Sequence, residues 1–420
     1  MALAISTARP LTVGRRIGSG ALFLLLGALM IGVFALGRHA GVDATFRLSS
    51  QGGIQVPPLV VPARTTSLVL GALVVAAGLW QLLRGWDRRT TNWAIGLVVA
   101  ALIFSLLTWG TAGESMSLVD LTGATLARSI PLVLGAMSGV LCERAGVINV
   151  NIEGQMLVGA FMAALVASVT SSLWFGLLGA AAGGALLALV LAFFAIRYLV
   201  DQVILGVVLN VFASGLTGFF FDRVLVPNQN SLNSPPTFAP IRIPGLASIP
   251  ILGPIFFDQS FFFYLTVAVL VVLQIALFRS RWGLRVRAVG EHPVAADTMG
   301  INVLFIRYRN VVLGGVLAGL AGAYLTIGTV GAFGKDISSG KGFIALAALI
   351  FGRWTPIGAL GAALIFGFAD ALQNILSILG APIPSSFLLM APYLATIFAV
   401  AGLVGKVRAP KADGKPYVKA

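Results

Sequence analysis

The residues most able to do chemistry form a polar set between two apolar stretches of the chain. The set comprises Glu143, Arg144, Asn149, Asn151 and Glu153. If the flanking stretches cross a membrane, ionisable groups at that depth are costly and tend to face a bundle interior or a cavity. Gly146 and Gly154 would permit a break in a helix, and a broken helix exposes backbone groups that can bind a solute. Two interpretations stay open: a loop with solvated charges, or a re-entrant segment that lines a cavity.

Other polar residues interrupt apolar runs further along the chain. Asn210 is either a hydrogen-bonding contact between helices or part of a translocation path. Asp370 and Asn374 are four residues apart and therefore share one helix face. Lys341 and Arg353 could extend toward opposite membrane interfaces. The candidate pathway residues are Asn149, Asn151, Glu153, Gln155, Asn210, Lys341, Phe343, Asp370 and Asn374.

No catalytic constellation is visible in the sequence. His39 and His292 lie far apart, and there is no HExxH pair, Walker A loop or Gly-x-Ser-x-Gly elbow. The single cysteine, Cys142, excludes an internal disulfide. We therefore expect no catalytic residue, no metal site and no cofactor in this chain.

The composition indicates a membrane protein. Of the 420 residues, 58% are hydrophobic and only 10% are charged, and the mean hydropathy is +0.98. A soluble domain carries about a quarter of its residues as charged groups. The net charge of +14 lies in short loops between apolar runs, which argues against a nucleic-acid partner and for the positive-inside rule.

Apolar stretches long enough to cross a bilayer recur from end to end. The fold class is all-α, a polytopic bundle of about 10–12 transmembrane segments. The stretches lie at residues 17–37, 65–83, 91–110, 118–141, 155–171, 173–196, 202–221, 259–278, 310–331, 342–352, 356–378 and 385–405. The first three lack polar residues on any one helical face, so we expect them to stay away from the transport pathway.

Lys and Arg placement predicts the orientation. Basic residues gather near the N-terminus, at 84–89, at 279–309 and in the segment 406–420. An even number of stretches separates each pair of these clusters, so all four can be cytoplasmic together. Both termini are then cytoplasmic, and the loops 38–64 and 222–258 face outward. Seven prolines in 222–258 predict a semi-rigid loop without a helix.

The basic segment 279–309 is too long for a tight turn. Within it, HPVAADTMGI predicts a short helix, because Pro293 suits a first turn and Gly300 suits a stop. Such a helix is either an interfacial helix held by anionic lipid or a docking element for a soluble partner.

Four motifs together resemble the permeases of bacterial ABC importers for ribose-type sugars, branched-chain amino acids and, above all, nucleosides. They are GLRVRAVGEHPVAADTMGIN at 283–302, ERAGVIN with EGQMLVGA at 143–160, DQVILG at 201–206 with Leu209-Asn210, and GKGFIALA at 340–347 with GRWTP at 352–356. The resemblance covers about residues 118–405 and implies that the first motif is a coupling loop seated on an ATPase subunit. Its coupling residues would be Arg285, Arg287, Ala288, Gly290, Glu291, Ala295, Ala296, Gly300 and Ile301.

The resemblance also implies a division of labour. This chain would be the permease subunit, in the cell membrane of a bacterium, with an extension at 1–115, a core at 116–405 and a basic tail at 406–420. Its partners would be an ABC ATPase that binds ATP and Mg, a second permease (identical or homologous) and an external substrate-binding lipoprotein. The expected solute is a nucleoside, with a simple sugar as the alternative. An ion-coupled secondary transporter, with Glu153 or Asp370 as its ion site, is a rival from another class, and a membrane enzyme is a second.

Overall fold

The computed structural model describes residues 13–37, 41–49, 56–380, 390 and 408–419. Among them, ten helices are long and apolar enough to cross a membrane. These are α1 (Val13–Leu29), α2 (Ala63–Leu83), α3 (Arg88–Gly110), α4 (Leu118–Arg144), α5 (Ile152–Thr170), α6 (Leu173–Ala192), α7 (Gln202–Phe220), α9 (Phe261–Arg279), α12 (Val303–Leu325) and α14 (Pro356–Ile378). The all-α polytopic class is confirmed, and the predicted stretch 385–405 lies almost wholly outside the described residues.

Short helices connect the long ones. They are α8 (Gln229–Leu232), α10 (Arg281–Glu291), α11 (Pro293–Thr298) and α13 (Lys341–Phe351). α13 has 11 residues and is too short to span a bilayer alone. Tight contacts between residues divide the chain into two units, Met1–Asp120 with Gln373–Ser385 and Leu121–Leu372 with Ser386–Ala420. We call the first the N-terminal unit and the second the core unit.

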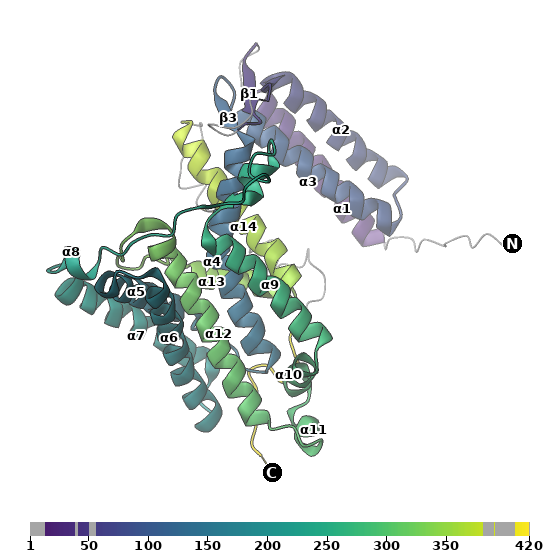
Figure 1. Cartoon of the computed structure of the whole chain (residues 1–420). Coiled ribbons are helices and arrows are strands. Elements are labelled where there is room, and N and C mark those ends of the chain that lie inside the picture. Colours follow the sequence, from purple (N-terminus) through teal and green to yellow (C-terminus); the bar gives the residue numbers. More distant parts are fainter. Residues whose placement is uncertain (1–12, 38–40, 50–55, 381–389, 391–407, 420) are drawn as a thin grey trace. The chain divides into compact units, whose positions relative to one another are not determined.

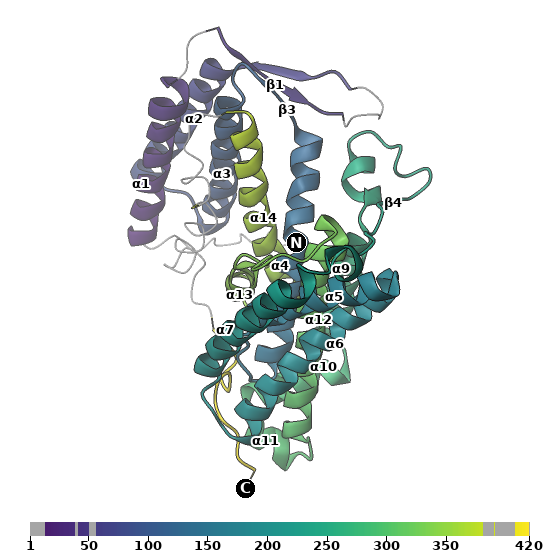
Figure 2. The same ribbon diagram turned by 90° about the vertical axis from the view of Figure 1, so that its left-hand side faces the viewer.

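In the N-terminal unit, α1, α2 and α3 lie side by side (Figure 2). Gln81 on α2 is fully buried, and its amide donates to Ser19 on α1 at 3.0 Å and to Thr91 on α3 at 3.3 Å. The expectation that these helices lack an inward polar face is therefore wrong at Gln81. A single amide can satisfy hydroxyls on two neighbouring helices, and a count of polar residues along one helix does not reveal this.

A small sheet accompanies these helices, where the sequence predicted only a loop. Strand β1 (Asp43–Arg47) pairs antiparallel with β2 (Leu59–Pro62) and parallel with β3 (Ser115–Ser117). Ala44 and Phe46 are buried while Asp43 and Arg47 are exposed, which is the alternation of a half-buried strand. The alternation covers only five residues, so it did not stand out between two long apolar stretches.

In the core unit, α5, α6 and α12 pack against one another over their length (Figure 1). Glycines make this approach possible. A Cβ on Gly319 of α12 would lie 2.1 Å from the Ala180 carbonyl oxygen, and one on Gly322 would lie 2.0 Å from that of Met156. Small residues that let helix backbones meet are typical of membrane helix pairs.

The proline-rich segment 222–258 is ordered, but it is not free of helix. It contains the short helix α8, a single turn at Gly253–Phe257, and strand β4 (Ile241–Arg242), which pairs with β5 (Asp258–Gln259). Asn233 fixes it to the connection after α12, since its side chain both donates to and accepts from Phe333 backbone groups. A proline at the first turn of a helix costs no hydrogen bond, so Pro254 is compatible with this turn.

Candidate functional site

The connection between α4 and α5, residues 145–151, is folded inside the core unit. Gly146 adopts a left-handed conformation with φ of +85°, which turns the chain as α4 ends. Glu143, Asn149, Asn151 and Glu153 are between 0% and 8% exposed. The solvated loop is therefore not what the structure has, and the chain is broken at a buried position between two membrane helices.

Amide side chains hold this break together. The Asn149 amide nitrogen donates to the Gln155 amide oxygen at 3.1 Å, and the Gln155 amide nitrogen donates to the Asn149 amide oxygen at 3.2 Å. Ser138 on α4 accepts a third hydrogen bond from Asn149 at 3.3 Å. Asn151 is completely buried, and neither polar atom of its side chain has a hydrogen-bond partner in the described part of the chain. A buried, unsatisfied amide is costly, so Asn151 is the residue of this set most available to a solute or to another conformation.

Helix α7 supports the break from one side. The Asn210 amide oxygen accepts from the backbone nitrogen of Gly154 at 2.7 Å, and its nitrogen donates to the Val150 carbonyl at 2.9 Å. About two turns before it on α7, the Gln202 amide oxygen accepts from the Ile148 backbone nitrogen at 2.7 Å. Of the two interpretations of Asn210, these contacts agree with a hydrogen-bonding link between helices.

Glu153 joins the start of α5 to the start of α13. Its carboxylate accepts from the Ser338 hydroxyl at 2.5 Å and from the backbone nitrogens of Gly340 at 2.8 Å and Gly342 at 2.6 Å. Unpaired N–H groups and the helix dipole at the start of α13 favour a negative charge at this position. A side chain at Gly342 would strike the Glu153 backbone, with a Cβ 2.4 Å from its nitrogen. Two motifs 187 residues apart thus form one joint.

A second joint lies where α4 ends. The Trp354 indole donates to the Glu143 carboxylate, and Arg144 donates to the Trp354 carbonyl at 2.8 Å. Arg353 and Trp354 both have a φ of +53°, a conformation that side chains rarely adopt. Here the ERAG and GRWTP motifs, which are separate segments in the sequence, hold each other in place.

The predicted coupling loop forms two helices, α10 and α11. Pro293 opens α11, and Gly300 follows it with φ of +79°, as the sequence predicts, whereas the sequence did not reveal α10. Gly290, near the end of α10, lies on the end of α4, because a Cβ there would be 2.2 Å from the Arg144 carbonyl oxygen. The loop is thus in backbone contact with the segment that leads into the buried break.

The predicted coupling residues divide by exposure. Gly290 and Ala296 are buried against the core unit, and Ile301 packs beside them. Arg285, Ala295 and Gly300 are exposed, together with Val294 at 67% and Met299 at 81%, which the sequence had not singled out. Arg287, Ala288 and Glu291 are half-buried. The expectation that Ala296 faces a partner is wrong, since it is 4% exposed and faces its own chain.

The tail was predicted only as basic, yet residues 408–419 bind this same end of the core unit. The Ala412 backbone nitrogen donates to the Gly290 carbonyl at 2.9 Å, and Arg307 donates to the Lys415 carbonyl at 3.0 Å. The Asp413 side chain faces the carboxylate of Glu143, and burial raises the pKa of Asp413 to about 7. The buried residues Ala412 and Tyr417 are five positions apart and form no period that would signal this contact in a sequence.

The remaining candidates lie apart from the break. Asp370 on α14 forms an ion pair of 2.7 Å with Arg128 on α4. Phe343 is 49% exposed on α13, and the Lys341 ammonium lies 3.4 Å from the Ser338 carbonyl. The Asn374 amide donates to Gln373 at 3.5 Å on the same helix. Among the described residues, no group of three His, Cys, Asp or Glu side chains could hold a metal ion.

Comparison with known proteins agrees with this geometry. The family model described as "Branched-chain amino acid transport system / permease component" matches residues 121–404. The chain belongs to this permease family. The chain is 44% identical to the guanosine ABC transporter permease protein NupQ of Bacillus subtilis, over 70% of the chain and 95% of NupQ. It is 40% identical to the nucleoside ABC transporter permease protein NupC of Lactococcus lactis, over 69% of the chain and 94% of NupC.

A third relative carries a different solute in its name. TsgC13 of Haloferax volcanii, whose name gives glucose as a provisional substrate of an ABC transporter permease, is 39% identical over 60% of the chain and 76% of TsgC13. No solved structure matches the chain. The family match begins at residue 121, where the core unit begins, so both joints and the α10–α11 segment lie within the matched part of this permease.

Proposed function

We propose that the chain is the membrane permease subunit of an ATP-driven importer and that its solute is a nucleoside. The observation that carries this proposal is the 44% identity that extends over 95% of a guanosine permease. The partners are an ABC ATPase, which binds ATP and Mg, a second permease and an external binding lipoprotein. The chain itself then contributes the pathway and no ATPase site.

The geometry suggests how ATP binding would reach the pathway. An ATPase that presses on the exposed face of α11 moves α10 with it, because backbone hydrogen bonds of His292 to Ala288 and Ala296 join the two helices. Gly290 passes the displacement to the Arg144 carbonyl, and residues 145–151 pass it to the amides of Asn149, Asn151 and Gln155. Each step is a packed or hydrogen-bonded contact, which is what a conformational switch requires.

A neutral polar solute suits the buried break. The groups at this position are amides, and the Glu153 carboxylate is occupied by three donors of its own chain. Amides can both donate to and accept from a base or a sugar hydroxyl. Ionised groups of the solute would need a counter-charge, and the amides themselves carry none.

Orientation follows from the same proposal. α10, α11 and the tail lie at one end of the core unit (Figures 1 and 2), which would be its cytoplasmic end in a bacterial cell membrane. Segment 222–258 would then be external, where a binding lipoprotein docks. A cysteine at Arg285 should react with a membrane-impermeant reagent only in opened cells, since Cys142 is buried.

Uptake by reconstituted vesicles tests the proposal. The permease, the ATPase, the second permease and the lipoprotein from the same genome are combined, and uptake of labelled guanosine, adenosine, ribose and glucose is measured with ATP. We expect ATP-dependent uptake of nucleosides that unlabelled nucleoside suppresses and glucose does not. Uptake of glucose alone would mean that the solute is a sugar and not a nucleoside. Uptake that needs an ion gradient and no ATP would overturn the importer mechanism.

A further inference from the structure

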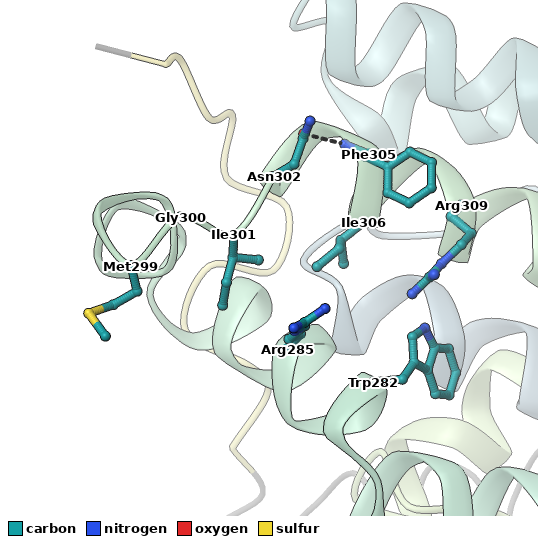
Figure 3. Close-up of a pocket in the computed structure, with 9 residues that line it drawn as sticks. All are labelled: Trp282, Arg285, Met299, Gly300, Ile301, Asn302, Phe305, Ile306 and Arg309. Atoms are coloured by element: carbon teal, nitrogen blue, oxygen red, sulfur yellow. Dashed lines mark hydrogen bonds between the residues drawn. The ribbon is translucent and has the colours of Figure 1, made fainter.

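A cavity of about 350 Å³ lies between α10 and the beginning of α12 (Figure 3). Trp282 and Arg285 of α10 line it on one side, and Phe305 and Arg309 of α12 line it on the other. Arg285 and Arg309 project into the same space in Figure 3. Ile301, one of the predicted coupling residues, also lines the cavity, but the proposed transport mechanism gives no role to Arg309 or Trp282.

The two arginines share the cavity without a counter-charge. No carboxylate lies within 4 Å of either guanidinium in the part of the chain that the structure describes. Nε of Arg309 is buried and has no hydrogen-bond partner there. A buried donor without an acceptor is costly. An anion in the cavity would accept from Arg309 and balance the positive charge of both arginines.

Arg309 is held in position by aromatic rings. Its guanidinium carbon lies 5.7 Å from the centre of the Trp282 ring and 5.4 Å from that of Phe305. Contacts of this kind favour a cation near the ring face. The guanidinium is therefore preorganised, which lowers the entropy lost when an anion binds.

The surroundings indicate the depth of the cavity in the membrane. Trp282 follows the end of the membrane helix α9 by three residues, and Arg309 stands in the second turn of the membrane helix α12. Tryptophan and arginine are typical of the membrane–water interface. Two large apolar side chains of these helices are exposed: Phe305, which lines the cavity, by 59%, and Leu284, which precedes Arg285 in the chain, by 61%. An anion here needs a polar head for the arginines and an apolar part for these side chains.

We propose that this cavity binds the headgroup of an anionic phospholipid, with its acyl chains along Leu284 and Phe305. The phosphate lies between the guanidinium groups of Arg285 and Arg309 and accepts from Nε of Arg309. A soluble phosphate would satisfy the arginines but leave the apolar rim in water. The lipid fixes α10 to α12, and so holds the segment that carries α11 against the membrane.

Lipid titration of the purified full-length chain tests the site. Dioleoyl phosphatidylglycerol, dioleoyl phosphatidylcholine, glycerol phosphate and inorganic phosphate are added to detergent-solubilised protein, and binding is followed by native mass spectrometry. We expect retention of phosphatidylglycerol over phosphatidylcholine, and no competition from glycerol phosphate or inorganic phosphate at equal concentration. The R285A/R309A variant should bind phosphatidylglycerol at least about tenfold more weakly, since each basic residue at an anionic surface contributes about 1 kcal/mol.

Matched variants separate this site from general surface charge. Arg281→Ala removes an exposed arginine from the same helix that does not line the cavity, and it should bind phosphatidylglycerol within about twofold of the unchanged chain. Arg309→Lys keeps the charge but loses Nε, so its affinity for phosphatidylglycerol should lie between those of Arg281→Ala and R285A/R309A. Equal losses for Arg281→Ala and R285A/R309A would overturn the proposal. The proposal would also be overturned if soluble phosphate bound as tightly as phosphatidylglycerol. The same holds if the R285A/R309A variant kept its lipid and lost binding of the ATPase instead.

Discussion

The core unit and the N-terminal unit are both made of membrane helices, but their helices meet in different ways. In the core unit, a Cβ added to Gly322 or Gly319 would lie 2.0 Å or 2.1 Å from a backbone oxygen of another helix. In the N-terminal unit, a Cβ added to Gly20 or Gly71 would first meet a side chain, Leu82 at 2.6 Å or Ile31 at 2.7 Å, and the backbone oxygen of the other helix only at 3.2 Å. A side chain can rotate away, whereas two backbones in contact cannot.

The two units also differ in what they bury. The core unit buries the connection between α4 and α5, a carboxylate that joins two helix starts, and four amides that hold the connection, those of Asn149, Gln155, Gln202 and Asn210. The N-terminal unit buries the Gln81 amide between three helices, where it links them and faces no break. The difference teaches that membrane helices can meet through a single polar link, as at Gln81, or through close backbone packing around several polar joints, as in the core unit.

The largest expected effect tests the packing contrast directly. Gly322→Val should abolish folded protein, because its side chain would overlap the Met156 carbonyl, and overpacking of this kind costs about 3 kcal/mol or more. Gly20→Val should leave folded protein with a lower melting temperature, since Leu82 can move. Gly361→Ala, where an added Cβ meets nothing within 4 Å, is the control. Size-exclusion profiles and melting curves in detergent measure all three. Equal losses for Gly322→Val and Gly20→Val would break the comparison.

The next effect concerns transport without loss of fold. Ala295→Glu puts a charge on the exposed face of α11, so uptake and substrate-stimulated ATP hydrolysis should both fall about tenfold or more, while the melting temperature stays unchanged. Ala296→Glu buries its charge inside the core unit and should lower the melting temperature as well. Assays in vesicles with the ATPase measure both. Normal uptake by Ala295→Glu would show that α11 does not contact the ATPase.

A smaller effect is expected at the joint between α5 and α13. Glu153→Gln replaces an acceptor oxygen by an amide group that meets backbone N–H donors, at a cost of about 1–3 kcal/mol. The melting temperature should fall and uptake should decrease. Glu114→Gln, an exposed glutamate of the N-terminal unit, should change neither. A stable, fully active Glu153→Gln protein would mean that this carboxylate does not join the helices.

The smallest expected effect depends on pH. It compares one acid from each unit, Asp413 in the core unit and Asp87 in the N-terminal unit. Asp87 caps α3 in water, where the Thr90 hydroxyl lowers its pKa, while burial raises the pKa of Asp413 to about 7. Docked Asp413, beside Glu143 and Arg307, holds its proton more tightly than undocked Asp413 does. Docking of the tail is therefore strongest below about pH 4, weakens as the pH rises from about 4 to about 7, and is constant above that.

A nitroxide at Lys419→Cys reports this change through its mobility. The spectrum should broaden on acidification through this range, and Asp413→Asn should remove the dependence. The same pH dependence in the Asp413→Asn protein would assign the effect to another group. Asp87→Asn in the Lys419→Cys protein should give, at every pH, the same spectrum as the Lys419→Cys protein that keeps Asp87.

Much of this architecture could be predicted from the sequence, because it depends on properties that the chain displays locally. Apolar length indicates a membrane helix, and Pro293 and Gly300 mark the two ends of α11 without reference to any neighbour. The amphipathic helix α10 was missed because its three arginines were read for orientation and not for periodicity. The strands of the N-terminal unit were missed because five residues carry too short an alternation.

The joints could be anticipated only as separate motifs. Nothing in the sequence around Glu143 indicates that Trp354, 211 residues later, donates to it. Likewise, Glu153 was a candidate for a solute site because acids within membranes usually serve function, and its three donors from one neighbouring segment emerge only in the folded chain. Ala296 was placed among the coupling residues on the resemblance of its motif, and the sequence does not show that this small side chain faces its own chain.

The docked tail has a consequence for how the protein is made. Residues 408–419 leave the ribosome after every described membrane helix, yet they supply the Ala412 contact to Gly290 and the Lys415 contact to Arg307. The end of the core unit that carries α10 and α11 is therefore finished last, after its helices have been inserted. Until then Arg307 and the Gly290 carbonyl lack these tail partners. A chain interrupted before the tail therefore exposes an incomplete surface that chaperones and proteases can recognise.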